Sequence, residues 1–268
     1  MAKQPSSKIR ATGKPLASVI LLWVRTDQPR EQGMSYWKDP HSRIISATNG
    51  LEEYRQIHLA EENPGQWPKA PGVETDIPVK RKIDGVADVT FKSILGPLLG
   101  RKQTQLAYKD EVNVFRRTLL YAGPPYSSRW YNVAEPFTKT GARSLIYLRK
   151  RDGIAGRKFQ KFINNELVPV LASTGALTEL RSEVFMRWRK SLWDTPHVSH
   201  DNPVEYHYHA SLKLGFFDET SQQSFLNSDE IRKLSDRLSK FTSAIHAYQV
   251  SEALTFVQHG KVLPHYLQ

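Results

Sequence analysis

The chain of 268 residues contains no cysteine. Disulfides, thiolate nucleophiles, zinc ribbons and iron–sulfur ligation are therefore excluded, and the composition is compatible with a reducing cytoplasm. A long hydrophobic run is also missing, because the longest, from Leu16 to Val24, is interrupted by Ser18 and is too short to cross a bilayer. No signal-peptide pattern precedes it. We therefore expect a cytoplasmic protein with no membrane partner.

Motifs that bind nucleotides or nucleic acids are absent as well. Gly85, Gly96 and Gly100 have neither the spacing nor the Lys-Ser/Thr pair of a P-loop or a dinucleotide fingerprint. There is no Gly-x-Ser-x-Gly nucleophile elbow and no aromatic signature of an RNA-binding domain. The formal net charge of +11 comes from 38 Lys and Arg against 27 Asp and Glu, but the basic residues are scattered among the acidic ones. We expect no nucleic-acid partner.

The pattern of apolar and polar residues predicts the same order of elements twice. In the first half it predicts a strand at 18–25, a helix at 33–48 with Ser35 as its N-cap, strands at 54–59 and 83–91, and a last strand at 110–121. Residues 93–105 carry Gly96-Pro97 and Gly100 and can hold only a short or broken helix. In the second half it predicts a strand at 145–149, a helix at 155–171, strands at 177–188 and 206–217, a helix at 227–241 and a strand at 244–257.

This order, β-α-β-β-α-β in each half, is the ferredoxin-like arrangement. An antiparallel sheet with helices on one face leaves its other face uncovered, so two such sheets are expected to press together. We predict an α+β protein with two ferredoxin-like repeats packed sheet to sheet as an intramolecular α/β barrel. The expected divisions are a disordered basic tail at 1–16 and two domains at 17–140 and 141–268.

Strand alternation predicts which side chains line the barrel. The polar side chains expected in the space between the sheets are Gln56, His58, Asp84, Asp88, Arg181, Glu183, His207 and His209. Tyr206, Tyr208 and Leu212 are expected to face the helices, because alternation permits only one of the two assignments.

Three segments resemble the EthD-type branch of the dimeric α/β-barrel superfamily. They are Tyr36-Trp37-Lys38-Asp39-Pro40-His41-Ser42-Arg43, then Gly50-Leu51-Glu52-Glu53-Tyr54-Arg55-Gln56-Ile57-His58-Leu59, and Asp84-Gly85-Val86-Ala87-Asp88-Val89-Thr90-Phe91. The resemblance implies the ferredoxin-like fold, a site at the histidine of the first segment, self-association into a homodimer and no general need for a metal. EthD-type proteins are named for a role beside a monooxygenase system, and sister branches bind haem.

His41 is the principal catalytic candidate. It lies one helical turn after Trp37, so both side chains share a helical face. An imidazole with a reference pKa of about 6.5 can both take and give a proton near neutral pH. Tyr54, His58 and Asp88 are expected as orienting or secondary groups. In the alternative interpretation His41 bonds a loop carbonyl and fixes the end of the helix.

Aromatic side chains predict an apolar substrate pocket. Tyr126 and Trp130 flank the turn Gly123-Pro124-Pro125, and Trp67 lies in a Pro- and Gly-rich loop at 61–78, a length typical of functional loops. The expected substrate-binding residues are Trp37, Trp67, Tyr126, Trp130, Arg181, His207 and His209. The last two could instead ligate a metal with His197, His200 or Glu205, but their spacing alone is a weak signal. We expect no metal and no cofactor.

The leading functional hypothesis is a cofactor-independent lyase of the dehydratase or cyclase type. It would perform acid/base chemistry on a small apolar carbonyl compound, aromatic or polyketide-like. Acid/base catalysis by one side chain contributes about 10²–10⁴-fold, so the substrate should already be activated. Two alternatives remain open: a non-catalytic accessory protein of a catabolic or monooxygenase system, and a haem- or metal-dependent oxidative enzyme.

Overall fold

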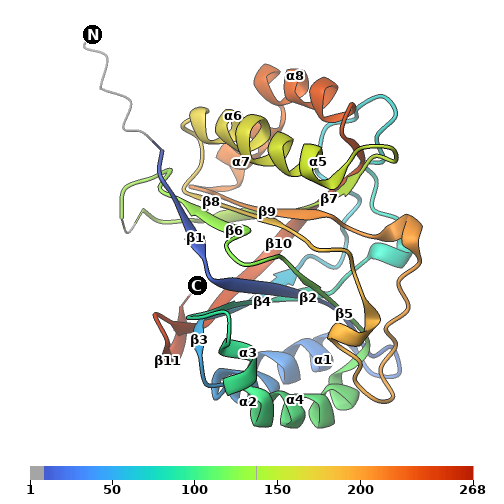
Figure 1. The fold of residues 1–268 in the computed structure, drawn as a ribbon, viewed down its shortest axis with the longest axis vertical. Coiled ribbons are helices and arrows are strands. Elements are labelled where there is room, and N and C mark those ends of the chain that lie inside the picture. The colour runs from blue at the N-terminus through green and yellow to red at the C-terminus, as the bar shows by residue number, and fades with distance from the viewer. Residues whose placement is uncertain (1–8, 137, 268) are drawn as a thin grey trace.

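A computed structural model describes residues 9–136 and 138–267 (Figure 1). The first half contains a helix in three parts, α1, a π-helical turn and α2, between β2 and β3, and the helices α3 and α4 between β4 and β5. Its elements are β1 (Ala11–Lys14), β2 (Leu16–Val24), α1 (Arg30–Tyr36), the π-helical turn Trp37–His41, α2 (Ser42–Ser46), β3 (Leu51–Leu59), the 3-10 turn Val79–Arg81, β4 (Gly85–Phe91), α3 (Gly96–Leu99), α4 (Arg101–Val114) and β5 (Phe115–Ala122).

The second half follows the same sequence of elements after a short strand that precedes it. Its elements are β6 (Ser128–Tyr131), β7 (Ala142–Lys150), α5 (Gly156–Phe162), the π-helical turn Ile163–Leu167, α6 (Val168–Ser173), β8 (Glu179–Val184), the 3-10 turns Lys190–Leu192 and Val204–Tyr206, β9 (Ala210–Phe216), α7 (Glu219–Leu226), α8 (Asp229–Leu238), β10 (Thr242–Gln258) and β11 (Lys261–Leu267).

The strands form a large antiparallel sheet in the order β1-β6-β8-β9-β7-β10-β3-β4-β2-β5, with β11 on β10. The order β3-β4-β2-β5 in the first half recurs as β8-β9-β7-β10 in the second. Strand β10 joins the halves, because its first part pairs with β7 and its second part with β3. Figure 1 shows the strands between two outer layers of helices. The predicted mixed α+β class with antiparallel pairing is confirmed.

Three apolar cores hold these layers together. One lies between the second-half strands and α5 to α8, and one between the first-half strands and α1, α2 and α4. The third lies between the two half-sheets and contains side chains from both, among them Leu21, Ile57, Leu145 and Tyr147. The two half-sheets therefore contact each other face to face within one chain, as expected. Their shared space is filled by side chains.

Charged groups are buried at the same interface. Glu179 accepts from Arg55 (2.5 Å) and Arg181 (2.8 Å), and Lys213 Nζ donates to Asp88 Oδ1 (2.6 Å). Burial alone would raise the pKa of Glu179, but the neighbouring guanidinium groups hold it well below its usual range. The pairs Arg55–Glu179, Arg181–Glu53 and Lys213–Asp88 each join the two halves, so they fix the register of one half-sheet on the other.

The predicted side-chain directions are right for β4 and β8 and wrong for β3. Asp88, Arg181 and Glu183 face the other half-sheet, but Gln56 and His58 face the helices. Both faces of β3 carry polar residues, so alternation alone could not tell them apart. The charged face, which includes Arg55, turns toward the opposite charges of the second half.

The predicted side-chain directions of Tyr208 and Asp84 are also wrong. Tyr208 was expected to face a helix, but it stacks on Tyr147 in the core between the sheets (4.7 Å). The reason is that β9 begins only at Ala210, after a 3-10 turn, so the alternation does not extend back to it. Asp84 precedes β4 and binds Arg30 (2.7 Å) near the start of α1.

Several element boundaries also differ from the prediction. The first helix begins at Arg30, so Ser35 is not its N-cap. The predicted strand at 110–121 begins at Phe115, because α4 extends to Val114. The helix α7 is an element that the sequence pattern did not predict. Of the tail expected to be disordered, residues 1–8 lie outside the described residues, and Ala11–Lys14 forms a strand that pairs with β6.

Two long loops cross between the halves. The first arm, residues 60–84, leaves β3 and places Trp67 in the second-half core, where its Nε1 donates to Ser235 Oγ (3.0 Å). The second arm, residues 185–209, leaves β8 and runs beside β5, with a bridge between Ser199 and Arg117. Each half is thus completed by a segment of the other. No helix in the described ranges is long and apolar enough to cross a membrane.

Candidate functional site

The Trp37–His41 motif lies on a π-helical turn inside the first helix of the sheet's outer layer. Pro40 lies within this turn, and because proline has no backbone N–H it cannot complete the regular hydrogen bonds of an α-helix. A π-helical turn also interrupts the first helix of the second half, at Ile163–Leu167. Such turns are frequent at functional sites.

The turn lines a small cavity of about 60 Å³ between the first-half sheet and its helices. Most of the wall is apolar. The lining residues that bear chemistry are His41, Tyr54, Glu111 and Trp193, and the apolar ones include Ile20, Leu22, Ala87, Val89 and Phe91. The site therefore lies between sheet and helices, whereas the sequence predicted a cavity between the two sheets.

His41 is held in a buried dyad with Asp110. Its Nδ1 lies 2.8 Å from Asp110 Oδ2, and its side chain is only 4 % exposed. Asp110 also accepts hydrogen bonds from Tyr36 Oη (2.8 Å) and Asn113 Nδ2 (3.2 Å). The hydrogen bond from His41 is the main reason that the pKa of Asp110 lies below its usual value. A carboxylate at Nδ1 fixes the tautomer with the basic lone pair on Nε2, and no residue within the described ranges bonds to that atom.

Glu111, the next residue of α4, is a second titratable group in the cavity. Its carboxylate accepts from Trp193 Nε1 (3.0 Å) and Thr195 Oγ1 (2.6 Å), both on the second arm. Burial raises the pKa of Glu111 to about 7. The pair Asp110 and Glu111 therefore differs strongly in proton affinity: the first is ionised, and the second can hold a proton near neutral pH.

Trp37, His58, Gln56 and Tyr54 form a buried layer beside the cavity. The rings of Trp37 and His58 stack at 4.6 Å, His58 Nε2 lies 2.9 Å from Gln56 Oε1, and Gln56 Nε2 donates to Tyr54 Oη (2.9 Å). Burial lowers the pKa of His58 to about 4, so its imidazole is neutral at physiological pH. The structure thus brings together His41, Trp37, Tyr54 and His58 as predicted, with His58 in a supporting layer.

The second half has no such site at the equivalent place. Glu166 lies in the matching π-helical turn and pairs with Arg237 at the surface. The side chains beneath that turn, Phe162, Ile163 and Leu167, are fully buried in an apolar core. In the described part of the second half, apolar side chains thus fill the place that the polar cavity takes in the first half.

Five of the predicted site residues lie away from this cavity. Asp88 and Arg181 belong to the charged interface between the sheets, and Trp67 is part of the second-half core. Trp130 lies on β6 beneath the guanidinium of Arg181 (3.9 Å), and Tyr126 is exposed in a turn with a positive φ of 62°. The predicted aromatic pocket around these residues is not formed.

His207 and His209 line a separate cavity of about 640 Å³ beside Trp188 and Arg149. His209 accepts a hydrogen bond from the backbone N–H of Lys150 (3.2 Å), and His207 Nε2 bonds to the carbonyl of Asn202 (2.9 Å). Both rings are thus engaged by backbone groups, and no group of three or more His, Asp or Glu side chains in the described part of the chain is arranged to hold a metal ion.

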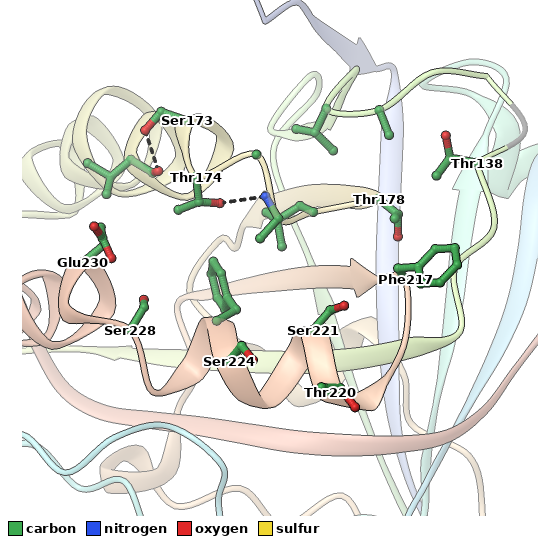
Figure 2. A pocket seen from close by; sticks show the side chains of 17 residues that line it. Thr138, Ser173, Thr174, Thr178, Phe217, Thr220, Ser221, Ser224, Ser228 and Glu230 are labelled. Atoms are coloured by element: carbon green, nitrogen blue, oxygen red, sulfur yellow. Dashed lines mark hydrogen bonds between the residues drawn. The ribbon is translucent and has the colours of Figure 1, made fainter.

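A larger open cleft of about 960 Å³ lies between α6 and α7 (Figure 2). Its wall carries many hydroxyl groups, but several are used within the protein: Ser173 bonds to the carbonyl of Val170 (2.8 Å) and Thr174 to that of Leu171 (2.8 Å). Among the described residues that line it, Glu230 is the one carboxylate, so they offer surface for binding and no acid/base pair.

Sequence reasoning missed Asp110, Glu111, Trp193 and Thr195. The sequence pattern places the first two on the strand predicted at 110–121, after a segment 93–105 that is predicted to hold only a short or broken helix. The sequence does contain a signal for this helix: residues 101–114, which form α4, contain no Gly or Pro. The arm residues could not be found by local pattern, because they reach the site from more than 80 residues away.

The fold is similar to that of solved structures at low sequence identity. One is an anthrone oxidase-like protein (TM-score 0.55, 9 % identity, covering 92 % of this chain and 96 % of that one). Two others are candidate monooxygenases, from Lactobacillus acidophilus NCFM (TM-score 0.52, 10 % identity, 95 % and 100 % covered) and Fusobacterium nucleatum subsp. nucleatum ATCC 25586 (TM-score 0.51, 9 % identity, 95 % and 97 % covered). At this identity the likeness establishes the fold alone, of the dimeric α/β-barrel type. No family model and no curated protein matches the sequence, so the EthD-type resemblance stays a prediction.

Proposed function

We propose that the protein is an enzyme that removes a proton from an activated, apolar carbonyl compound, with His41 as the base. The buried contact between His41 and Asp110 is the observation that carries this proposal. The carboxylate stabilises the imidazolium that forms when Nε2 takes the proton, as in other His–Asp pairs. The apolar wall of the cavity suits an aromatic or polyketide-like substrate.

Glu111 is the second group in this proposal. With a pKa of about 7 it can donate a proton to the carbonyl oxygen as negative charge develops there. Its carboxyl lies on the residue next to Asp110, and two groups of opposite protonation at one cavity are the usual arrangement for acid/base work.

Substrate entry requires the second arm to move. The cavity of about 60 Å³ is smaller than the roughly 150 Å³ that accommodates one benzene ring. Trp193 and Thr195, which are bonded to Glu111, close it from one side. Opening of this arm would admit the substrate, and its return would exclude water.

Two fates of the deprotonated substrate are proposed. In the lyase reaction, a leaving group departs from the adjacent carbon, as in a dehydration. In the oxidative reaction, which the names of the similar structures favour, molecular oxygen reacts with the carbanion, and a CH2 group and O2 give a C=O group and water. Both fates begin with the same proton transfer and need no bound cofactor.

The architecture supports a finer proposal about the fold. The repeated strand order, and the π-helical turn at the same place in each half, support two ferredoxin-like repeats forming one intramolecular barrel. The divisions at 17–140 and 141–268 follow these repeats. Cytoplasmic localisation and self-association of the whole chain remain predictions.

Exchange of substrate hydrogen for deuterium tests the proton transfer directly. The probes are anthrone, for exchange and oxidation, and β-hydroxypropiophenone, for loss of water, each followed by NMR in D2O. We expect His41→Gln and Asp110→Asn each to lower the exchange rate by about 10²-fold or more. The exposed histidine variant His265→Ala is the matched control and should exchange at the wild-type rate.

Comparing exchange by the wild type and by His41→Gln also distinguishes an enzyme from an accessory protein. A binding protein would bind the probes without catalysing exchange, and His41→Gln would then change affinity only. Equal exchange by wild type, His41→Gln and solvent alone would refute the catalytic role.

A further inference from the structure

A short apolar cap covers one end of the first-half helical layer. Residues 94–99 form this cap, which contains α3, and four large aliphatic side chains project from it into solvent. Ile94 is 49 % exposed, Leu95 63 %, Leu98 70 % and Leu99 63 %. Single exposed apolar residues are ordinary, but four within six positions make a continuous patch that signals a binding surface.

The glycines at the cap explain why the leucines point outward. A Cβ atom added to Gly96 would lie 2.6 Å from Phe91 Cδ1, and one added to Gly100 would lie 2.4 Å from Thr48 Cγ2. The backbone of the cap is therefore pressed against the protein, and the side chains between the glycines have no room beneath it. Phe91 and Thr48 also line the cavity of the candidate site. The cap therefore packs against two side chains of the cavity wall.

The chain segment that carries the cap has charge of one sign. Residues 89–109 contain Lys92, Arg101, Lys102 and Lys109 and no aspartate or glutamate. All four basic residues are exposed, and none forms an ion pair with a residue in the described ranges. Figure 1 shows α3 beside α2 and α4, on the outer layer of the molecule. An apolar centre is thus flanked by free positive charge.

We propose that this cap docks on an anionic lipid surface. The aliphatic side chains would enter the boundary between headgroups and acyl chains, while the flanking Lys and Arg contact the anionic headgroups. A second copy of this chain fits less well, because a two-fold contact through the cap would bring the basic residues of both copies toward one another. The docking is peripheral, and it revises for this one surface the expectation of no membrane partner.

Docking would bring the Phe91 and Thr48 wall of the cavity toward the bilayer. The inference does not depend on the reaction that follows, because lipid binding is measured without any substrate.

Co-sedimentation with vesicles tests the proposal. Wild-type protein is mixed with vesicles of phosphatidylcholine alone or of phosphatidylcholine with phosphatidylserine. We expect at least tenfold stronger partitioning onto the anionic vesicles, and weakening by added salt. Leu98→Ser with Leu99→Ser should lower partitioning at least tenfold, and Arg101→Gln with Lys102→Gln should lower it roughly fivefold per residue.

Matched controls keep the test decisive. Val79→Ser with Val204→Ser removes two exposed aliphatic side chains elsewhere and should leave partitioning unchanged. Melting temperatures of all variants are compared to verify folding, and the charge variant still tests the proposal if the serine variant is unstable. Absence of partitioning, or equal partitioning of wild type and both cap variants, would overturn the proposal. Sedimentation velocity that shows a dimer lost in the serine variant would assign the cap to a second copy instead.

Discussion

Replacing Glu111 by glutamine should change how stability depends on pH. The carboxyl has a pKa of about 7 in the folded protein against an ordinary value of 4.5, and its side chain is almost fully buried. Between these values the folded state holds a proton that the unfolded state has lost. Stability from this group is therefore fully present below about pH 4.5 and is lost as the pH rises toward 7.

The size of the effect follows from the shift. A difference of about 2.5 pKa units at ~1.4 kcal/mol per unit corresponds to about 3 kcal/mol, of which most develops between about pH 5 and pH 8. Glu111→Gln has no proton to lose. Relative to wild type, its free energy of unfolding should therefore improve by about 2–3 kcal/mol over that interval.

Urea unfolding followed by tryptophan fluorescence measures this difference. His58, whose pKa is lowered to about 4, contributes stability of the opposite pH dependence, present above about 6.5 and lost as the pH falls to 4. It is the same in both proteins, so subtraction removes it. Glu61→Gln, at an exposed loop position, is the control and should show no such trend. A wild-type minus Glu111→Gln difference that stays constant with pH would refute the assigned protonation.

Two further changes test the packing. Glu179→Ala should cost about 3–5 kcal/mol in urea unfolding, because it leaves the buried Arg55 and the half-buried Arg143 and Arg181 without their shared carboxylate. The more exposed Glu166→Ala should cost less than about 1 kcal/mol. A cost below about 1 kcal/mol for Glu179→Ala would contradict the charged interface. Gly85→Ala should cost about 1–3 kcal/mol, since its Cβ would lie 2.3 Å from Trp37 Cζ3, and an unchanged melting temperature would show that the ring is free to move.

The sequence was sufficient for elements with a strong local pattern. The apolar run at Leu16–Val24 is β2, and the alternation in Gly85–Phe91 correctly turned Asp88 toward the other half. Trp37 and His41 of the histidine motif line the same cavity, because spacing along a helix fixes which side chains share a face. These features depend on residues only a few positions apart.

The rest depends on contacts between distant segments. Asp110 is the partner of His41 because α4 packs beside the first helix. The face of β3 that lies toward the second half is the one whose charges pair with opposite charges on β8. Trp67 illustrates the same limit: the length of its loop is typical of a functional loop, yet its side chain packs in the core of the other half. Local periodicity contains no information about which half a crossing loop joins.

Because each arm packs on the opposite half, the two halves hold each other together by noncovalent contacts. Cutting the backbone between β6 and β7 would break the covalent link between two fragments but not their contacts. Trp67 of the first fragment would stay in the core of the second, and Trp193 of the second would stay bonded to Glu111 of the first. Such fragments should recombine when produced together. Neither should persist when produced alone, since each would lack a wall that its partner supplies. The catalytic candidate in the first half is thus built from both parts of the chain, although only one of them carries the histidine.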